Sequence, residues 1–378
     1  MTKLFTPIQL GGVTLSNRIV VSPMCQYSAD DGCMNDWHFT HLGSLAISGA
    51  GLLVIEATAV TRDGRISHGC TGLYSEHNEA SMKRVVDHCR RLTKNAIGIQ
   101  LGHAGRKAST QVPWEGRSAL GANENPWPTV APSAVPYDDR FGWHTPRELT
   151  VAEIKAIVDA FAASAQRALR LGLDAVELHA AHGYLLHQFF SPLSNQRKDQ
   201  YGGSPENRMR APLEAAQALR DAWPKERCLG ARISGHDWHD EGAKIEDTIA
   251  FARELKKIGY DYVCVSSGAL LGKTRYTIGP NYQVPLAEAV KKAVPDIAVR
   301  AVGMIADPDQ AEEIVASGKA DMVAMARAFL DNPRWVWHAA EHFGALVTVP
   351  RQYERAAYNA WQGSKLARPD GTQPWLEP

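Results

Sequence analysis

The chain has 378 residues, of which 44% are hydrophobic and 22% are charged, a composition typical of a globular protein with a large core. Its 41 basic and 41 acidic residues give a formal net charge of zero, which argues against nucleic acid or an anionic membrane surface as the main partner. No apolar run reaches the length that a membrane span requires.

The chain begins with a predicted hairpin over residues 8–15 and then alternates between strand-like and helix-like segments. Strands are predicted at residues 18–21, 51–57, 96–101, 174–178, 228–233, 262–266, 297–302 and 321–325. Helices are predicted at about residues 38–48, 78–93, 151–171, 205–222, 244–258, 285–294, 308–316 and 333–342. Capping signals support four of the helix starts: Thr150 with Glu153, Ser204-Pro205, Asp307-Pro308 and Asn332-Pro333.

Eight strand–helix units in one chain predict an α/β fold of the (β/α)₈, or TIM-barrel, type, and we expect residues 1–378 to form one domain. A doubly wound sheet is the alternative, but it requires a Gly-x-Gly-x-x-Gly turn that this sequence lacks. Residues 105–147, after the third strand, show no regular period and are too long for an ordinary loop. We expect a capping insertion there rather than a disordered one, because it contains Trp114, Trp127, Phe141 and Trp143.

The stretch 174–184 carries the densest candidate chemistry, because His179, His182 and Tyr184 follow a predicted buried strand. The carboxyl end of such a strand faces the ligand site in parallel α/β proteins. Two imidazoles can donate hydrogen bonds to one oxygen that gains negative charge, and a phenol is a competent proton donor. A zinc site is one alternative, although it needs a third ligand. The other alternative is that both histidines are ordinary core or turn residues.

The residues just past each strand should face one site if the barrel forms. These residues offer hydrogen-bond donors, a thiol and a phenol but no carboxylate. They are Ser22–Tyr27, Ala57, Thr58, Gln100, His103, Arg232, Ser266–Gly268, Gly303, Ala326 and Arg327. A backbone N–H near Gly303 and the Arg327 guanidinium suit a phosphate, although Arg327 alone also fits a surface salt bridge. The set favours a phosphorylated cofactor with a planar polar ring.

The six cysteines, at positions 25, 33, 70, 89, 228 and 264, have no paired spacing and indicate reduced thiols rather than a disulfide framework. Residues 1–7 lack the apolar segment of a signal peptide. We therefore expect a cytoplasmic protein.

Four segments resemble the old yellow enzyme family of flavin-dependent ene-reductases. They are Ser22-Pro23-Met24-Cys25, Gln100–Arg106, His179–Tyr184 and Asp199–Arg208, and the resemblance extends over nearly the whole chain. The Pro-Met-Cys form of the first segment is similar to that of the thermophilic-type and xenobiotic reductase subclass.

The resemblance implies a barrel that binds one FMN noncovalently and takes hydride from NADPH or NADH. The FMN contacts that it implies are Ser22, Pro23, Met24, Cys25, Ala57, Gln100, Arg232, Gly303, Ala326 and Arg327. Arg232 near the flavin N1 region would favour the anionic reduced ring. Cys25 would tune the flavin and contact substrate rather than act as a nucleophile, whereas a buried inert thiol is the alternative on composition alone.

The implied reaction is reduction of the activated C=C bond of α,β-unsaturated carbonyl compounds, and by extension of nitro compounds. His179 and His182 would hold the carbonyl oxygen, flavin N5 would deliver hydride and Tyr184 would donate the proton, with Tyr27 against the substrate. The tail at residues 343–378 resembles a segment that reaches a neighbouring subunit's site, with Arg355 as the candidate residue. This implies a homodimer or homotetramer, while a frayed terminus is the alternative.

Three other functions remain in competition. A 2,4-dienoyl-CoA reductase-like flavoenzyme would need an iron–sulfur cysteine cluster, and no cysteine follows Cys264. A metal-dependent barrel hydrolase would use the two histidines as ligands. A flavin-storage protein would bind FMN without turnover.

Overall fold

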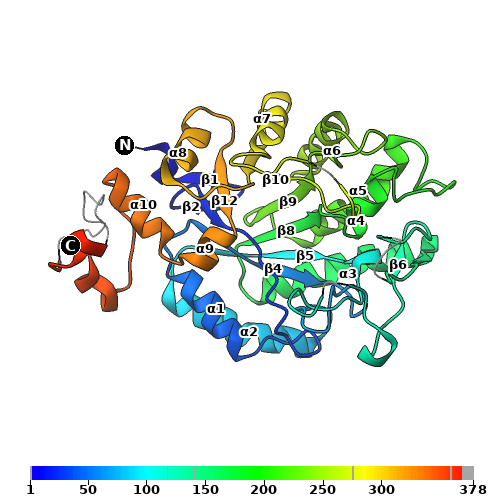
Figure 1. Ribbon diagram of the computed structural model, residues 1–378, viewed down its shortest axis with the longest axis horizontal. Coiled ribbons are helices and arrows are strands. Elements are labelled where there is room, and N and C mark those ends of the chain that lie inside the picture. The colour runs from blue at the N-terminus through cyan, green and yellow to red at the C-terminus, as the bar shows by residue number, and fades with distance from the viewer. Residues whose placement is uncertain (1, 117, 139–141, 275, 358–359, 368–378) are drawn as a thin grey trace.

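A closed barrel of parallel strands forms the centre of the molecule (Figure 1). The computed structural model describes residues 2–116, 118–138, 142–274, 276–357 and 360–367. Within them the barrel order is β10-β11-β12-β3-β4-β5-β8-β9, so neighbours in sequence are neighbours in space. The strands are β3 (Ile19–Val21), β4 (Leu52–Ala59), β5 (Ala96–Gly102), β8 (Ala175–Ala180), β9 (Cys228–Ser234), β10 (Tyr262–Ser266), β11 (Ala298–Ala301) and β12 (Met322–Met325). The TIM-barrel prediction is confirmed.

The strands are apolar on both faces because both faces are covered. In β4, Leu53 and Ile55 pack under the surrounding helices, whereas Leu52 and Val54 point into the barrel. Leu10 and Leu15 join that inner core from the predicted hairpin, which forms as β1 (Ile8–Leu10) and β2 (Val13–Leu15). The hairpin therefore contributes directly to the barrel core.

Helices surround the barrel (Figure 1), and those that follow its strands in turn are α1 (Asp36–Ala46), α2 (Glu76–Leu92), α3 (Val151–Arg170), α5 (Pro205–Ala222), α6 (Ile245–Ile258), α7 (Val284–Ala293), α8 (Pro308–Ala316) and α10 (Trp335–Phe343). Three of the predicted caps are present, since the Thr150, Ser204 and Asp307 side chains each accept a hydrogen bond from the backbone N–H three residues on.

The fourth predicted helix start was wrong. Asn332 Oδ1 accepts a hydrogen bond from the backbone N–H of Arg334, which forms a turn before the helix, and α10 begins only at Trp335. An Asn-Pro pair therefore marked the turn and not the N-cap.

Residues 105–147, the predicted capping insertion, lie between β5 and α3. Their described part contains η2 (Gly105–Lys107), η3 (Ala122–Glu124) and β6 (Val130–Ala131), which pairs with β7 (Arg147–Glu148). Trp127 Nε1 donates to the Asp63 carbonyl at 2.9 Å, and Trp143 packs edge-on against Tyr137. Trp114 is 67% exposed, and Phe141 lies outside the described residues.

The remaining elements are short: η1 (Lys3–Phe5), α4 (Leu185–Phe190), α9 (Arg327–Asp331), η4 (Arg351–Ala356) and α11 (Ser364–Ala367). The last two lie beyond α10, at one edge of the molecule (Figure 1). Among the described helices, none combines the length and the apolar character that crossing a membrane would require.

Candidate active site

A large hollow of about 540 Å³ opens at the carboxyl ends of the barrel strands. Its lining comes from the ends of β3, β8, β9, β10, β11 and β12 and from the loops that follow them, and it includes Ser22, His182, Arg232, Ser266, Gly303, Ala326 and Arg327. Active sites of this fold lie at this end of the barrel. The ends of six of the eight barrel strands therefore meet at one hollow, whereas those of β4 and β5 are not part of its lining.

The turn between β8 and α4 places the histidines. The strand continues to Ala180, two residues past its predicted end, so His179 belongs to the strand itself. The chain then turns through left-handed conformations at His182 (φ 60°) and Gly183 (φ 71°). A Cβ at Gly183 would lie 2.3 Å from the Ala269 carbonyl oxygen, so this position requires glycine.

His179, His182 and Tyr184 lie together. The two imidazole centroids are 5.2 Å apart, and the His179 and Tyr184 rings are 4.9 Å apart. His182 Nε2 lies 2.8 Å from Ser266 Oγ, which fixes the ring. Within the described residues, His179 Nδ1 is buried without a hydrogen-bond partner. A buried ring nitrogen in that state is suited to an oxygen brought by a ligand.

Both imidazoles are held neutral. Desolvation, followed by the positive charge of Arg232, keeps the pKa of each histidine well below its ordinary value. Removal from water raises the pKa of the Tyr184 phenol well above its usual range. At neutral pH the cluster therefore offers two neutral N–H groups and one protonated hydroxyl.

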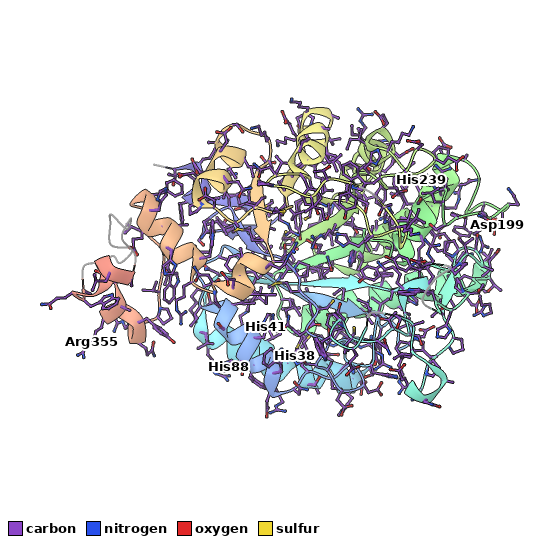
Figure 2. All side chains as sticks on the ribbon, viewed as in Figure 1. His38, His41, His88, Asp199, His239 and Arg355 are labelled. Carbon is purple, nitrogen blue, oxygen red and sulfur yellow. The ribbon has the colours of Figure 1, made fainter. Side chains whose placement is uncertain are left out.

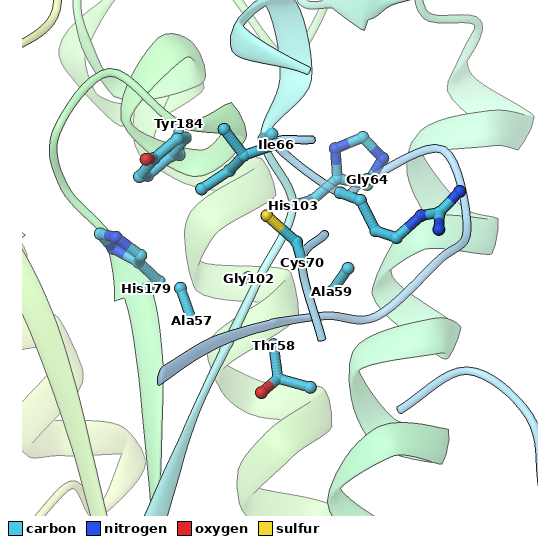
Figure 3. A pocket seen from close by; sticks show the side chains of 12 residues that line it. Ala57, Thr58, Ala59, Gly64, Ile66, Cys70, Gly102, His103, His179 and Tyr184 are labelled. Atoms are coloured by element: carbon cyan, nitrogen blue, oxygen red, sulfur yellow. The ribbon is translucent and has the colours of Figure 1, made fainter. Parts of the chain in front are cut away.

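A small hollow of about 20 Å³ lies beside the histidine cluster. Figure 3 shows His179 and Tyr184 on one side of it, with Ile66 and Cys70 facing them, and Ala57 of β4 also contributes to its wall. This space is narrow and mostly apolar, which suits a small hydrocarbon substituent.

Cys25 lies in the loop after β3 and is partly buried. Desolvation, with smaller contributions from Cys70 and Glu56, raises the pKa of its thiol well above the ordinary value. A neutral thiol is a weak nucleophile.

The loop that carries Cys25 is anchored by Glu56. Glu56 Oε2 accepts a hydrogen bond from the Gln26 backbone N–H at 3.0 Å, and its Oε1 lies 3.5 Å from His38 Nε2.

Glu56 was missed at the sequence level. It sits where the register of β4 against β5 shifts between Ile55 and Ala57, and such a β-bulge leaves little trace in a short apolar run.

Lys107 was also missed. Its Nζ donates to the carbonyls of His182 (2.7 Å) and Ala269 (2.9 Å) and lies over the rings of Tyr137 and Tyr184. It thus ties the β5, β8 and β10 loops together. The sequence feature that could have identified Lys107 is its position directly after the segment from Gln100 to Arg106.

The basic part of the large hollow fits the flavin mononucleotide implied by the sequence. Among the described residues, Arg232 Nε is buried without a hydrogen-bond partner. Gly303 adopts φ 111°, and a Cβ there would lie 2.9 Å from Gln283 Oε1, so this position favours glycine. Arg327 begins α9 directly after β12. A guanidinium with exposed backbone N–H groups is a good phosphate site.

Several predicted site residues do not line the large hollow. Gln100 is buried inside the barrel, where its Nε2 donates to Glu177 Oε1 at 2.7 Å. Tyr27 adopts φ 52° and packs edge-on against Trp114. Pro23 and Met24 lie in the loop after β3 with Cys25. Arg355 is exposed on η4 and is not among the residues that line either hollow in the described part of the chain (Figure 2).

The donor set does not fit the zinc alternative. Across the part of the chain that the structure describes, no group of three or more His, Cys, Asp or Glu side chains is arranged to hold a metal ion.

Comparison with known proteins identifies the family of this chain. The pattern of the NADH:flavin oxidoreductase / NADH oxidase family matches residues 3–344. An NADPH dehydrogenase of Geobacillus sp. (strain WCH70) is 42% identical over 359 residues, which cover 94% of this chain and 98% of the relative. An NADPH dehydrogenase of Bacillus subtilis (strain 168) is 40% identical over 355 residues, 93% of this chain and 98% of the relative.

Among solved structures, morphinone reductase superposes with a TM-score of 0.76 at 29% identity, covering 92% of this chain and 91% of that protein. The barrel and the family match define a flavoprotein that acts as an oxidoreductase. The chain belongs to the NADH:flavin oxidoreductase / NADH oxidase family, within its old yellow enzyme group, with FMN as cofactor and NAD(P)H as electron donor.

Proposed function

We propose that this protein is an ene-reductase that saturates the activated C=C bond of α,β-unsaturated carbonyl compounds, and of nitroalkenes by the same logic. The observation that carries the proposal is the neutral His179–His182 pair beside the Tyr184 phenol at the mouth of the barrel. Two such donors are suited to an oxygen that gains charge as the reaction proceeds.

Five of the ten proposed flavin contacts line the large hollow: Ser22, Arg232, Gly303, Ala326 and Arg327. Gly303, Ala326 and Arg327 would hold the phosphate, and Arg232 would lie near the ring system. Ser22, Pro23, Met24 and Cys25, together with Ala57 and Gln100, would border the isoalloxazine and ribityl parts. When bound, FMN would supply the hydride for the β-carbon of the substrate, with NAD(P)H as the electron donor.

The protein's own groups then do three things. His179 and His182 donate hydrogen bonds to the carbonyl oxygen, which withdraws electrons from the β-carbon; one such donor typically contributes about 3 kcal/mol of transition-state stabilisation. Tyr184 gives its proton to the α-carbon. Tyr27 and Cys25 form part of the wall against the substrate, and the protonated thiol does not act as a nucleophile.

The competing functions lack support from the site. The metal-dependent hydrolase has no suitable ligand group in the described residues. Among the 378 residues, no cysteine follows Cys264 that could bind the iron–sulfur cluster of a dienoyl-CoA reductase-like flavoenzyme. We also propose that the protein acts on small molecules in the cytoplasm as a homodimer or homotetramer. The predicted contact with a neighbouring subunit concerns the tail at residues 343–378, of which residues 358–359 and 368–378 lie outside the described residues.

The test is to purify the protein, record its flavin absorbance, bleach it anaerobically with NADPH, and then add 2-cyclohexenone. The proposal predicts that the yellow colour returns and that cyclohexanone accumulates in equal amount. A bound flavin that NADPH cannot bleach would instead indicate a storage protein, and a colourless protein that does not bind added FMN would contradict the proposal altogether.

A further inference from the structure

Four polar side chains from four strands meet inside the barrel, in the layer next to His179 and Arg232. They are Gln100 of β5, Glu177 of β8, Tyr262 of β10 and Arg300 of β11, and each is no more than 2% exposed. The other residues of this inner core are mostly apolar. A buried ion pair is costly to desolvate, so its presence in an apolar barrel calls for a physical reason.

The strand register builds the network. Gln100 pairs with Glu177 across β5 and β8, Glu177 pairs with Gly230 of β9, and Gly230 pairs with Tyr262. A Cβ at Gly230 would lie 2.1 Å from Tyr262 Cζ, so only glycine lets the Tyr262 ring pass over this point. The phenol thereby reaches Glu177 Oε2, to which it donates at 2.9 Å.

Both oxygens of Glu177 are committed. Its Oε1 accepts from Gln100 Nε2 at 2.7 Å, while its Oε2 accepts from Tyr262 Oη and from Arg300 Nη2. The Arg300 guanidinium also lies over the Tyr262 ring, 4.7 Å from its centroid. The carboxylate therefore cannot rotate without breaking several bonds at once.

An ionised carboxylate only accepts hydrogen bonds, so Gln100 must turn its NH₂ group toward Glu177 and its oxygen the other way. We propose that Glu177, held by Arg300, is a positioning residue that orients Gln100 so that its amide oxygen accepts from the imide N3–H of the flavin. The inference rests on the proposed FMN contact of Gln100. Arg300 balances the charge of Glu177, so that no net negative charge lies under the flavin site.

The test compares FMN with 3-methyl-FMN, which lacks the N3–H, by fluorescence titration of apoprotein. Wild type should prefer FMN strongly. In the double variant Glu177→Met/Arg300→Met, which removes both charges, the Gln100 amide is free to turn. We expect the ratio of the two Kd values to fall by about tenfold, the equivalent of one hydrogen bond.

Tyr262→Phe is the matched control, because it removes a donor to Glu177 but keeps the bond to Gln100; its ratio should stay within about twofold of wild type. Should the double variant not fold, Glu177→Gln is measured in its place. The same Kd ratio in wild type and in the Glu177 variant would overturn the inference. Failure of the wild type to bind either flavin would instead overturn the proposed function.

Discussion

At the scale of single residues, the site combines the neutral imidazoles of His179 and His182 with the amine of Lys107, whose pKa is unusually low. Desolvation, followed by the charge on Arg106, lowers the pKa of Lys107 to about 7. Its Nζ lies 4.8 Å from the centre of the Tyr184 ring. A positive charge at that ring stabilises the phenolate that forms when the phenol gives up its proton.

This predicts which group governs the pH dependence of enone reduction. Lys107 is charged below about pH 7 and neutral above it, so proton donation by Tyr184 should become several-fold slower between pH 6 and pH 8. His179 and His182 stay neutral over this range, because their pKa values lie well below the ordinary one. Stopped-flow reoxidation of the reduced protein across this range measures the effect.

In Lys107→Met the rate should be lower and independent of pH from 6 to 8. If the variant kept an inflection near pH 6.5, histidine protonation would be the cause, and the assignment to Lys107 would be wrong.

At the scale of elements, the sequence predicted the barrel strands well because each is a short apolar run buried on both faces. The segment at 262–266 coincides with β10. Short helices escaped prediction, since α4 and α9 have too few residues to show a helical period. The residues of the histidine cluster were adjacent in sequence and easily found, but Glu56 and Arg300 depend on strand register, which pattern alone does not reveal.

The β8–α4 turn gives a sharp test of backbone constraint. Gly183→Ala places a Cβ against the Ala269 carbonyl in a left-handed conformation, so we expect a loss of about 1–3 kcal/mol in unfolding free energy and a lower enone rate. Thermal and denaturant unfolding measure the first effect.

Gly172→Ala is the control, because φ there is 74° and no atom lies within 4 Å of the added Cβ. Gly172→Ala therefore introduces the same left-handed backbone strain as Gly183→Ala, but its Cβ meets no neighbouring atom. Equal destabilisation by both substitutions would show that the close approach to Ala269 is unimportant.

At the scale of the whole molecule, the proposed assembly turns on the segment beyond α10. Arg355 is exposed on η4. If this arginine completes a neighbouring subunit's substrate site, Arg355→Ala should reduce enone turnover about tenfold with FMN content unchanged, whereas Arg351→Ala on the same η4 should have little effect. Sedimentation gives the oligomeric state in parallel. A fully active monomer would contradict the shared site.

The central claim is that His179 and His182 together hold the substrate oxygen beside the flavin. The direct measurement is stopped-flow reoxidation of NADPH-reduced protein by 2-cyclohexenone for His179→Ala, His182→Ala and the control His239→Ala, whose histidine is exposed after β9. We predict that all three retain FMN, that the first two lose about 10²–10³-fold in rate, and that the control matches wild type. Wild-type rates in both His179→Ala and His182→Ala would contradict the account.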